Sequence, residues 1–429
     1  MNLRAKLSID HYIGAPLAWL LNGVARVIAR VWRRDHSLRT PPRAVLFMKF
    51  MGLGSIARAA FLLEAARQRF PQARIGFACF PGCAGLVRLY PQVDDVIVVR
   101  DNGLFALARG TVRLVLWAWR NRADLVIDLE VHSKYSSICS ALTLARDRAG
   151  FAGLTSRFRR GLYTHLIFWN PIRPVDVAYR QLGRALGMRP RLRRVKPSVT
   201  AAGKNEVRGL LATLGIPEGA RLLGVNPNAS ELRLERRWPG ANFARVITAL
   251  PPADGLHVLL LGSRAERDYV AQVCALVTGN ANPVHNVAGR LPFEGYVALL
   301  ARLDLLLTND SGPLHIAAAL RVPTVSLWGP GHPRHYILRG AQHVHFYRPI
   351  YCSPCIYTTD VPPCGGDNQC MQRLDWRPVA RAVCSLLGLP MPPGPGVERV
   401  AASEPAKHLP VFGYWQRESA ASALRGVPR

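Results

Sequence analysis

The sequence predicts an α/β protein with two doubly wound, parallel-sheet domains that face each other across a cleft. Short apolar segments alternate with segments of helical length from residue 44 onward, which is typical of βαβ units. The alternation stops in a proline- and arginine-rich segment at residues 188–198 and restarts at residue 221. Because ligands of such sheets bind beyond the carboxyl ends of the strands, we expect functional residues to follow strand ends.

The predicted elements follow in order along the chain. The first series has strands at 44–50, 74–80, 94–99 and 123–130, and the second has strands at 221–230, 257–263, near 283–287, 304–310 and 324–330. The pattern is weak between residues 150 and 200. The predicted organisation is a helix and linker (1–42), an N-terminal domain (43–195), a C-terminal domain (196–388) and a disordered tail rich in proline, glycine and alanine (389–429).

An amphipathic helix is predicted at residues 13–33, before the first core strand. Its apolar positions recur at helical spacing on one face; they are Ile13, Leu17, Leu20, Leu21, Val24, Val27, Ile28 and Val31. The opposite face carries Asn22, Arg26, Arg30 and Arg33. The pattern favours a helix in a membrane interface, with the arginines meeting anionic headgroups. The alternative is a helix packed on its own domain.

The composition is strongly basic, with a formal net charge of +29 over 429 residues, and only six of the 56 basic residues are lysine. This bias fits either a general preference for arginine or an anionic partner, such as a membrane face, a phosphorylated ligand or nucleic acid. No basic stripe with interleaved aromatics and no zinc-finger or RNA-recognition signature is present, so nucleic acid is not expected. No signal peptide and no apolar stretch of 18 residues are found, and we expect a cytoplasmic protein.

A glycine-containing turn, MGLGSIARA at residues 51–59, follows the first strand. Gly52 and Gly54 let a ligand approach the backbone, and the start of the next helix favours an anion. A dinucleotide site also needs an acidic residue at the end of the second strand, but that strand ends in CFPGCAG. A nicotinamide cofactor is therefore not expected.

A second candidate site is the segment TNDSGPLHIAAALRVPTVSLWGP, residues 308–330. Asp310 would emerge at a strand end, Ser311 and Gly312 would begin the next helix, and His315 would lie one turn into it. Free backbone N–H groups at a helix start can hold phosphate oxygens. Taken singly, Ser311 is also explained as a helix N-cap and His315 as a core histidine.

Two further segments carry candidate phosphate and ribose contacts. At the end of the strand segment 221–230, Asn228 and Ser230 are turn residues that can hydrogen-bond phosphate, and Arg236, which follows, can supply a cation. The alternative for this segment is a solvated basic loop. Glu266 lies early in a helix, where its carboxylate can accept ribose hydroxyls or simply favour the helix dipole.

Four cysteines cluster near the end of the second domain. Cys352, Cys355, Cys364 and Cys370 are spaced C-x₂-C-x₈-C-x₅-C. Four thiolates on a short loop can form a tetrahedral structural site for zinc or iron. The spacing departs from common zinc fingers, and disulfides are not expected in a reducing cytoplasm.

These segments together resemble glycosyltransferase family 9, the ADP-heptose:lipopolysaccharide heptosyltransferases. The resemblance spans roughly residues 44–388 and is carried by NDSGPLHIAAALRVPTVSLWGP, with support from AVLFMKFMGLGSIARA, FPQARIGF, YPQVDDVIVV, DLVIDLE, GVNPNAS with RRWP, and the cysteine cluster. It implies a GT-B fold, in which the N-terminal domain binds the acceptor and the C-terminal domain binds the nucleotide-sugar. It also implies transfer with inversion at the anomeric carbon and no metal in catalysis.

The resemblance assigns roles to the candidate residues of the C-terminal domain. Asp310, Ser311, Gly312 and His315 would bind the donor's phosphates and sugar. Ser230 and Arg236 would contact the diphosphate, with Arg236 standing where the family usually has lysine. Glu266 would bind the ribose.

The first turn departs from the family, which has Gly-Asp where this chain has Gly54-Ser55. That aspartate is the proposed general base, and a serine hydroxyl of ordinary pKa cannot take its role. Glu130 or His132, just after the strand at 123–130, would substitute; alternatively, a weak base suffices, or the protein binds without transferring.

The sequence thus predicts a cytoplasmic, membrane-peripheral glycosyltransferase that moves a heptose from ADP-heptose to a lipopolysaccharide or other lipid-linked acceptor. The alternatives are the same fold with another nucleotide-sugar, or a non-catalytic membrane-associated binding protein.

Overall fold

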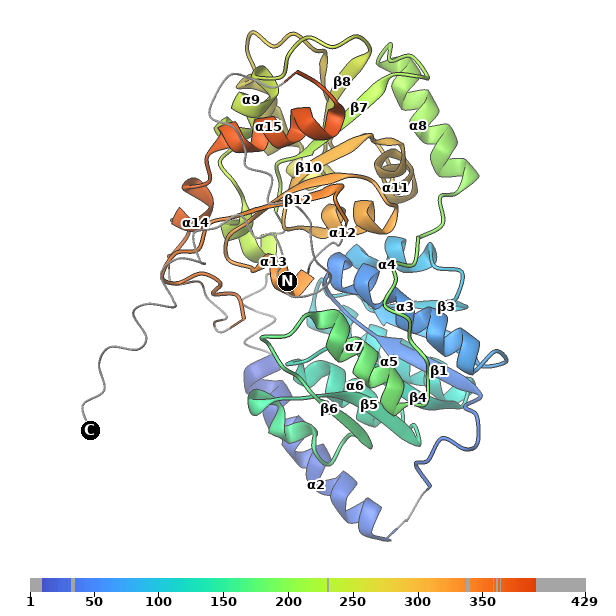
Figure 1. Cartoon of the computed structure of the whole chain (residues 1–429). Coiled ribbons are helices and arrows are strands. Elements are labelled where there is room, and N and C mark those ends of the chain that lie inside the picture. Colours follow the sequence, from blue (N-terminus) through green and yellow to red (C-terminus); the bar gives the residue numbers. More distant parts are fainter. Residues whose placement is uncertain are drawn as a thin grey trace, which may run out of the picture. The chain divides into compact units, whose positions relative to one another are not determined.

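The computed structural model describes residues 10–390, except 32–34, 230, 337–339, 358, 360, 361 and 363 (Figure 1). The chain divides into two compact units, Met1–Ser198 and Val199–Arg429. The expected tail at 389–429 lies outside the described residues apart from its first two. No described helix combines the length and the apolar character needed to span a membrane.

The first unit is built on a six-stranded parallel sheet in the order β3-β2-β1-β4-β5-β6. Its strands are β1 (Ala44–Met48), β2 (Arg74–Cys79), β3 (Asp95–Val98), β4 (Ala123–Asp128), β5 (Asp147–Ala152) and β6 (His165–Phe168). Every residue of β1, AVLFM, is buried. A run of apolar residues without alternation is expected for a strand that helices cover on both faces.

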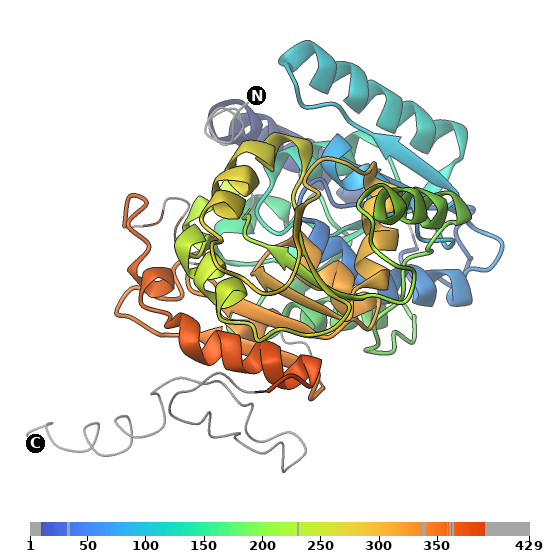
Figure 2. The same ribbon diagram turned by 90° about the horizontal axis from the view of Figure 1, so that it is seen from above.

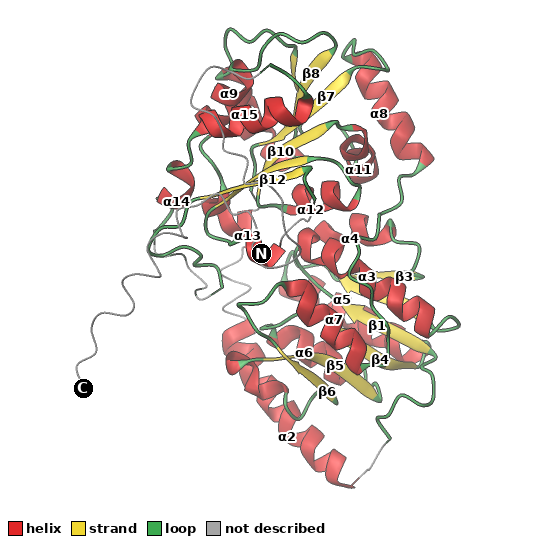
Figure 3. Ribbon diagram, in the orientation of Figure 1, coloured by secondary structure: helices red, strands yellow, loops and turns green. Residues whose placement is uncertain are grey.

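Helices flank this sheet in two groups (Figure 3). One group is α3 (Leu53–Arg69), α4 (Pro81–Arg88) and α7 (Val175–Ala185), in which α3 contacts both others. The other is α5 (Leu104–Arg120), α6 (Lys134–Leu142) and α2 (Ala15–Val31), in which α6 contacts both others. Two short helices, η1 (Asp10–Gly14) and η2 (Leu154–Arg159), pack beside α2.

The second unit repeats the same topology in the order β12-β11-β10-β7-β8-β9. Its strands are β7 (Arg221–Asn226), β8 (Leu256–Leu260), β9 (Val284–Asn286), β10 (Leu305–Asn309), β11 (Thr324–Trp328) and β12 (His343–Tyr347). Its helices are α8 (Ala201–Thr213), η3 (Glu231–Arg236), α9 (Gly240–Thr248), η4 (Arg264–Glu266), α10 (Arg267–Ala275), α11 (Phe293–Arg302), α12 (Gly312–Ala319), α13 (Pro333–Tyr336), α14 (Gln369–Gln372) and α15 (Trp376–Leu387). The prediction of two doubly wound parallel sheets is confirmed.

Three strands were not predicted from the sequence: β5, β6 and β12. The β5 segment, DRAGFA, contains a buried aspartate, an arginine and a glycine, so it shows neither an apolar run nor strict alternation. Asp147 is tolerated there because it pairs with His36 at 2.9 Å and with Arg146 at 2.8 Å. Such polar pairing inside a sheet hides the hydrophobic signal on which strand prediction depends.

Helix α2 packs on its own unit through the side next to its exposed apolar stripe, and Leu21 of the predicted apolar face belongs to this packed side. Ala18 and Leu21 contact Ile138 and Phe158, and Asn22 is buried against Gly161. The stripe of Leu17, Leu20, Val24, Val27 and Val31 is exposed. The helix is therefore packed on its domain, as the alternative interpretation held, yet this stripe faces outward. Trp32 and Arg33 lie outside the described residues.

Candidate functional site

Each sheet has one switch point, where neighbouring strands send their connections to opposite faces. In the first unit it lies between β1 and β4, and in the second between β7 and β10. Loops that follow such a pair of strands diverge and leave a crevice at the carboxyl edge of the sheet. In both units most of the candidate site residues predicted from the sequence follow these strands; Glu266 follows β8 instead, and the four cysteines follow β12.

In the second unit, Asp310 is the centre of a charged cluster. Its carboxylate lies 3.4 Å from Arg236 Nε and 3.7 Å from His315 Nε2, and the Arg236 Nη1 donates to the Asp310 backbone carbonyl at 3.3 Å. Asp310 and His315 are buried and Arg236 is largely covered. Burial disfavours the charged form of Arg236, but Asp310 together with Tyr336, Tyr357 and Glu235 outweighs burial, and the pKa of Arg236 is raised. The cluster thus keeps a permanent cation beside the start of α12.

Ser311 and Gly312 form the turn from β10 into α12, as predicted. Ser311 precedes the helix, but its side chain makes no capping hydrogen bond. Its hydroxyl instead accepts from Asn226 Nδ2 at 3.2 Å and lies 3.3 Å from Thr308 Oγ1. The first backbone N–H groups of α12 are therefore not satisfied by this side chain and can meet an anion.

The other residues that were predicted to contact the donor do not belong to the Asp310 cluster in the described structure. Asn228 is buried, and its amide donates to Asn226 Oδ1 and to the Leu261 carbonyl, so it braces β7 against β8. Glu266 accepts from the Ser263 backbone N–H at 2.8 Å in a capping box at the start of η4. Ser230 lies outside the described residues.

Two residues that the sequence did not single out also border the Asp310 cluster. A Cβ added at Gly331 would lie 2.9 Å from Asp310 Oδ2 and 3.6 Å from the Tyr357 hydroxyl. That hydroxyl accepts from the His332 backbone N–H at 3.1 Å, and the Tyr357 ring packs on His335 at 4.2 Å. In the sequence, the pair of glycines after β11, in WGPG, is the one feature that could have pointed to this part of the site.

Two of the four clustered cysteines, Cys355 and Cys370, border the same segment after β11. A Cβ at Gly329 would lie 2.8 Å from Cys370 Sγ, and the Cys355 backbone N–H donates to the Pro330 carbonyl. Burial, together with the neighbouring Cys355, Cys352 and Cys364, raises the pKa of Cys370 to about 12. No disulfide joins the cysteines in the described part of the chain. Nor is any group of three or more His, Cys, Asp or Glu among the described residues placed to hold a metal ion.

In the first unit, the turn after β1 has the backbone geometry that its glycines suggested. Gly52 precedes α3 with φ of 95°, a left-handed conformation that favours glycine. Ser55 lies in the first turn of α3, and its hydroxyl would be 3.3 Å from a Cβ added at Gly52. A side chain at Gly52 would therefore meet both strain and the Ser55 hydroxyl.

Glu130, which follows β4, reaches across to the end of β1. One carboxylate oxygen accepts from Lys49 Nζ at 2.6 Å, and the other accepts from the Phe50 backbone N–H at 2.8 Å. Both side chains are largely buried. Burial disfavours the charged form of Lys49, but Glu130 together with Tyr179 and Asp128 outweighs burial, and the pKa of Lys49 is raised. The carboxylate is thus fixed beside the glycine turn with a permanent cation as its partner.

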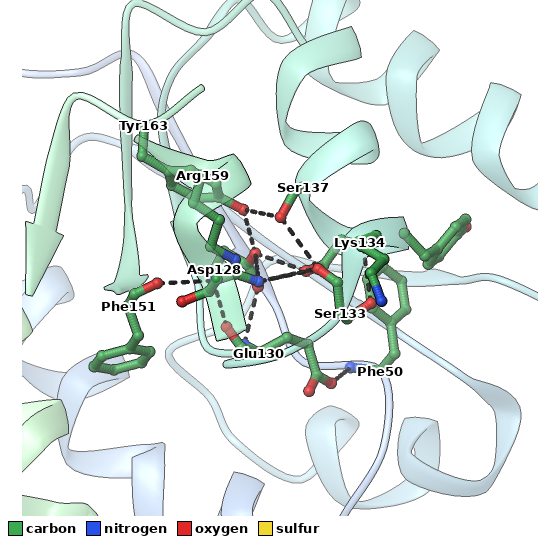
Figure 4. A network of polar contacts seen from close by, with 12 residues as sticks. Phe50, Asp128, Glu130, Ser133, Lys134, Ser137, Phe151, Arg159 and Tyr163 are labelled. Carbon is green, nitrogen blue, oxygen red and sulfur yellow. Dashed lines mark hydrogen bonds and ion pairs between the residues drawn. The ribbon is translucent and has the colours of Figure 1, made fainter. Parts of the chain in front are cut away.

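A buried network around Asp128 holds Glu130 in place (Figure 4). Asp128 pairs with Arg159 at 3.2 Å, and both side chains are fully buried. Tyr163 and Ser136 donate to the same carboxylate, at 2.5 and 2.7 Å. Arg159 Nη1 donates to the Glu130 backbone carbonyl at 2.7 Å. Burial raises the pKa of Asp128, and Arg159 with these hydrogen bonds opposes that effect.

His132, the other candidate base, is exposed two residues after Glu130. The three candidates Ser55, Glu130 and His132 therefore border the same switch point, through α3 and the segment between β4 and α6. Of these, the Glu130 carboxylate is the one that is fixed on both oxygens.

Comparisons with known proteins relate the chain to heptosyltransferases. The chain is 32% identical over 327 residues to lipopolysaccharide heptosyltransferase 1 of Pseudomonas aeruginosa, covering 73% of this chain and 86% of the relative. With lipooligosaccharide heptosyltransferase 2 of Campylobacter jejuni, identity is 28% over 148 residues, 34% of this chain and less than half (45%) of the relative.

Solved structures show the same fold. The Escherichia coli ADP-heptose lipopolysaccharide heptosyltransferase II is similar with a TM-score of 0.64 at 21% identity, covering 80% of this chain and 98% of that one. A family 9 glycosyltransferase from Veillonella parvula is similar with a TM-score of 0.61 at 22% identity, covering 71% and 85%. The two Rossmann-like sheets are those of the GT-B fold. The family model described as glycosyltransferase family 9 (heptosyltransferase) matches residues 119–364, more than half of the chain, and the chain belongs to that family.

Proposed function

We propose that the protein is a heptosyltransferase-like glycosyltransferase that uses ADP-heptose as donor and a lipopolysaccharide core or another lipid-linked saccharide as acceptor. The observation that carries the proposal is the Asp310 cluster at the switch point of the second unit. A cation, a buried histidine and the start of a helix converge there, as the departure of a diphosphate requires. Family membership and relatives named as lipopolysaccharide heptosyltransferases support the same donor and acceptor classes.

The second unit would hold the donor. Arg236 and the first N–H groups of α12 would bind the diphosphate oxygens, and His315 would donate to the same group. Asp310 would orient the side chains of Arg236 and His315 and accept a sugar hydroxyl. Ser230 is proposed as a further phosphate contact, and Glu266 would bind the ribose by exchanging its capping bond to Ser263.

The first unit would hold the acceptor and take up its proton. The acceptor hydroxyl oxygen forms a bond to the anomeric carbon, the bond from that carbon to the diphosphate oxygen breaks, and the configuration inverts. ADP leaves with the electron pair, and the hydroxyl proton passes to Glu130. Lys49 would keep the Glu130 carboxylate in place beside Gly52 and Gly54.

The role of Glu130 is tested with Glu130→Gln, which retains an oxygen for the Phe50 N–H but loses the charge. Loss of a general base lowers kcat about 10²- to 10⁴-fold with little change in KM. His132→Ala and Ser55→Ala test the two other candidate bases. Glu64→Gln is the control, because Glu64 pairs with Arg193 on the surface. If His132→Ala shows the large loss and Glu130→Gln does not, the proton passes to His132 instead.

The donor class is tested by titrating ADP, GDP, UDP and dTDP into the protein by calorimetry. We expect selective binding of ADP that is lost in Asp310→Ala and His315→Ala. His257→Ala is the matched control, because His257 lies near the amino end of β8, at the opposite edge of the same sheet. Selective binding of another nucleotide would mean that the donor sugar is attached to that nucleotide instead of ADP. Binding of none, by folded protein, would favour a non-catalytic homologue.

The protein is proposed to act as a peripheral protein on the cytoplasmic face of the inner membrane, with α2 against the lipid surface. The outward apolar stripe of α2 supports this location. The expected partners are thus the nucleotide-sugar, the amphiphilic acceptor and the membrane, without nucleic acid.

A structural zinc or iron at the cysteine cluster is a further proposal, outside the chemical step. The four thiols influence one another electrostatically, but they would have to approach and lose their protons to bind a metal. Elemental analysis after anaerobic purification tests this. One metal per chain, lost in Cys355→Ser together with thermal stability, is expected; a metal-free and equally stable protein would refute it.

A further inference from the structure

The exposed apolar stripe of α2 has a counterpart on a second helix of the same layer. On α2, Leu20 is 64% exposed and Val31 is 82% exposed. On α5, Phe105 is 82% exposed, Val112 is 56% exposed and Trp119 is 51% exposed. Phe105, Val112, Leu116 and Trp119 recur at helical spacing, whereas Gly110, Leu114, Val115 and Ala118 form the buried side of α5. Both helices therefore turn an apolar stripe away from their own core.

The two helices belong to one surface. α6 contacts both of them, and Figure 2 shows α2 and α5 along the same side of the first unit. Two apolar side chains at the end of α6, Leu142 and Leu144, are also exposed. Trp119 joins α5 to this end, because its indole N–H donates to the Leu142 carbonyl at 3.1 Å. A tethered indole with an exposed ring suits the boundary between water and lipid.

The charges on this surface have one sign. α5 contains Arg109, Arg113 and Arg120, and neither α5 nor α2 contains an aspartate or glutamate. Arg109, Arg113 and Arg120 are exposed. A second copy of the same face would meet these charges with like charges, which opposes self-association. Anionic headgroups above an apolar layer complement both the arginines and the stripes.

We propose that α2, α5 and the end of α6 together form a surface that binds an anionic lipid bilayer, with α5 as a second contact of equal weight to α2. The proposal deepens the membrane location proposed above and does not depend on the donor. Two contacts are physically reasonable, since a single weak membrane anchor gives only marginal, reversible binding.

Vesicle co-sedimentation of the full chain tests this surface. The probes are vesicles of phosphatidylglycerol mixed with phosphatidylcholine, compared with phosphatidylcholine alone. The α5 variant is Phe105→Asn/Val112→Asn, and the α2 variant is Leu20→Asn/Val27→Asn. The control is Ile172→Asn/Leu192→Asn, two exposed apolar residues of the same unit that lie on neither helix.

We expect the native protein to bind the anionic vesicles only, and the α5 and α2 variants each to bind about tenfold more weakly or worse. Arg109→Glu/Arg113→Glu should weaken binding by more than tenfold, because each basic residue near an anionic surface contributes about fivefold. The control should bind like the native protein.

Native vesicle binding by the folded α5 variant would overturn the proposal and leave α2 as the sole contact. Equal binding to neutral vesicles would overturn the role of the arginines. A dimer in sedimentation velocity that the α5 variant dissociates, without a change in vesicle binding, would identify the surface as an interface between two copies. Nucleotide titration of the same variants separates these outcomes from a failure of the proposed donor.

Discussion

The buried pair of Asp128 and Arg159 gives the sharpest prediction about stability. Asp128→Asn removes one charge and leaves the guanidinium of Arg159 buried without a counter-ion. Breaking a buried pair in this way costs about 3–5 kcal/mol. Asparagine still accepts one of the bonds from Tyr163 and Ser136, so we expect the lower end, about 3 kcal/mol. For a unit of this size the melting temperature falls by roughly 6–12 °C.

Thermal unfolding, combined with hydrogen exchange of the β4 and β5 amides, assigns the loss to the first unit. Asp95→Asn is the matched control, because Asp95 pairs with Arg74 on the surface and such pairs contribute less than about 1 kcal/mol. The double variant Asp128→Asn/Arg159→Met should be more stable than Asp128→Asn, since it removes the uncompensated charge. A single variant no less stable than the control, or a double variant less stable than the single one, would refute the reasoning.

Two further predictions concern the loop after β11. Gly331→Ala places a Cβ 2.9 Å from Asp310 Oδ2, so we expect about tenfold weaker ADP binding with folding retained, by calorimetry. Gly209→Ala, where a Cβ meets nothing within 4 Å, should bind normally; equal affinities would show that the Asp310 carboxylate yields freely. Burial, with Arg334 and His335, lowers the pKa of His332 to about 4. The neutral imidazole is thus favoured in the folded state, so its stabilising effect is complete above the unfolded pKa of about 6.5 and is lost as pH falls toward 4. Unfolding is measured as a function of pH. Between pH 6.5 and 4 we expect the free energy of unfolding to fall by roughly 1–3 kcal/mol less in His332→Gln than in the native protein. The same pH dependence in both proteins would contradict this.

The sequence predicted those parts of the site that lie within one local pattern. Asp310 and His315 are five residues apart at a strand end, and this spacing indicated that they would lie close together. Arg236 was found by its position after the first strand of its unit. For Glu266 the alternative to ribose binding was an interaction with the helix dipole; the capping box was not predicted, although Ser263 and Glu266 have its spacing.

Contacts over long sequence distances could not be predicted in the same way. The Lys49–Glu130 pair joins residues 81 apart, and neither residue type indicates a partner by itself. Tyr357 reaches the Asp310 cluster from an irregular loop, where no periodicity specifies direction. Periodicity could not predict the face by which α2 packs either, because this face contacts residues far away in the sequence, such as Phe158 and Gly161.

The repeated topology explains why each unit has a pair of opposite charges at its switch point. In each unit the first and fourth strands are neighbours, and the loops that follow them meet at the switch point. In the first unit these loops supply Lys49 and Glu130, 81 residues apart, and in the second Arg236 and Asp310, 74 residues apart. Each pair joins a cation from the first loop to a carboxylate from the fourth, and the first pair is braced by a buried network through Asp128 and Arg159. A braced carboxylate suits a fixed proton acceptor, whereas a pair held by long contacts of 3.4 Å can adjust to a diphosphate as it leaves. We therefore expect changes in the Asp128 network to lower kcat more than donor affinity, and changes around Asp310 to act mainly on donor affinity.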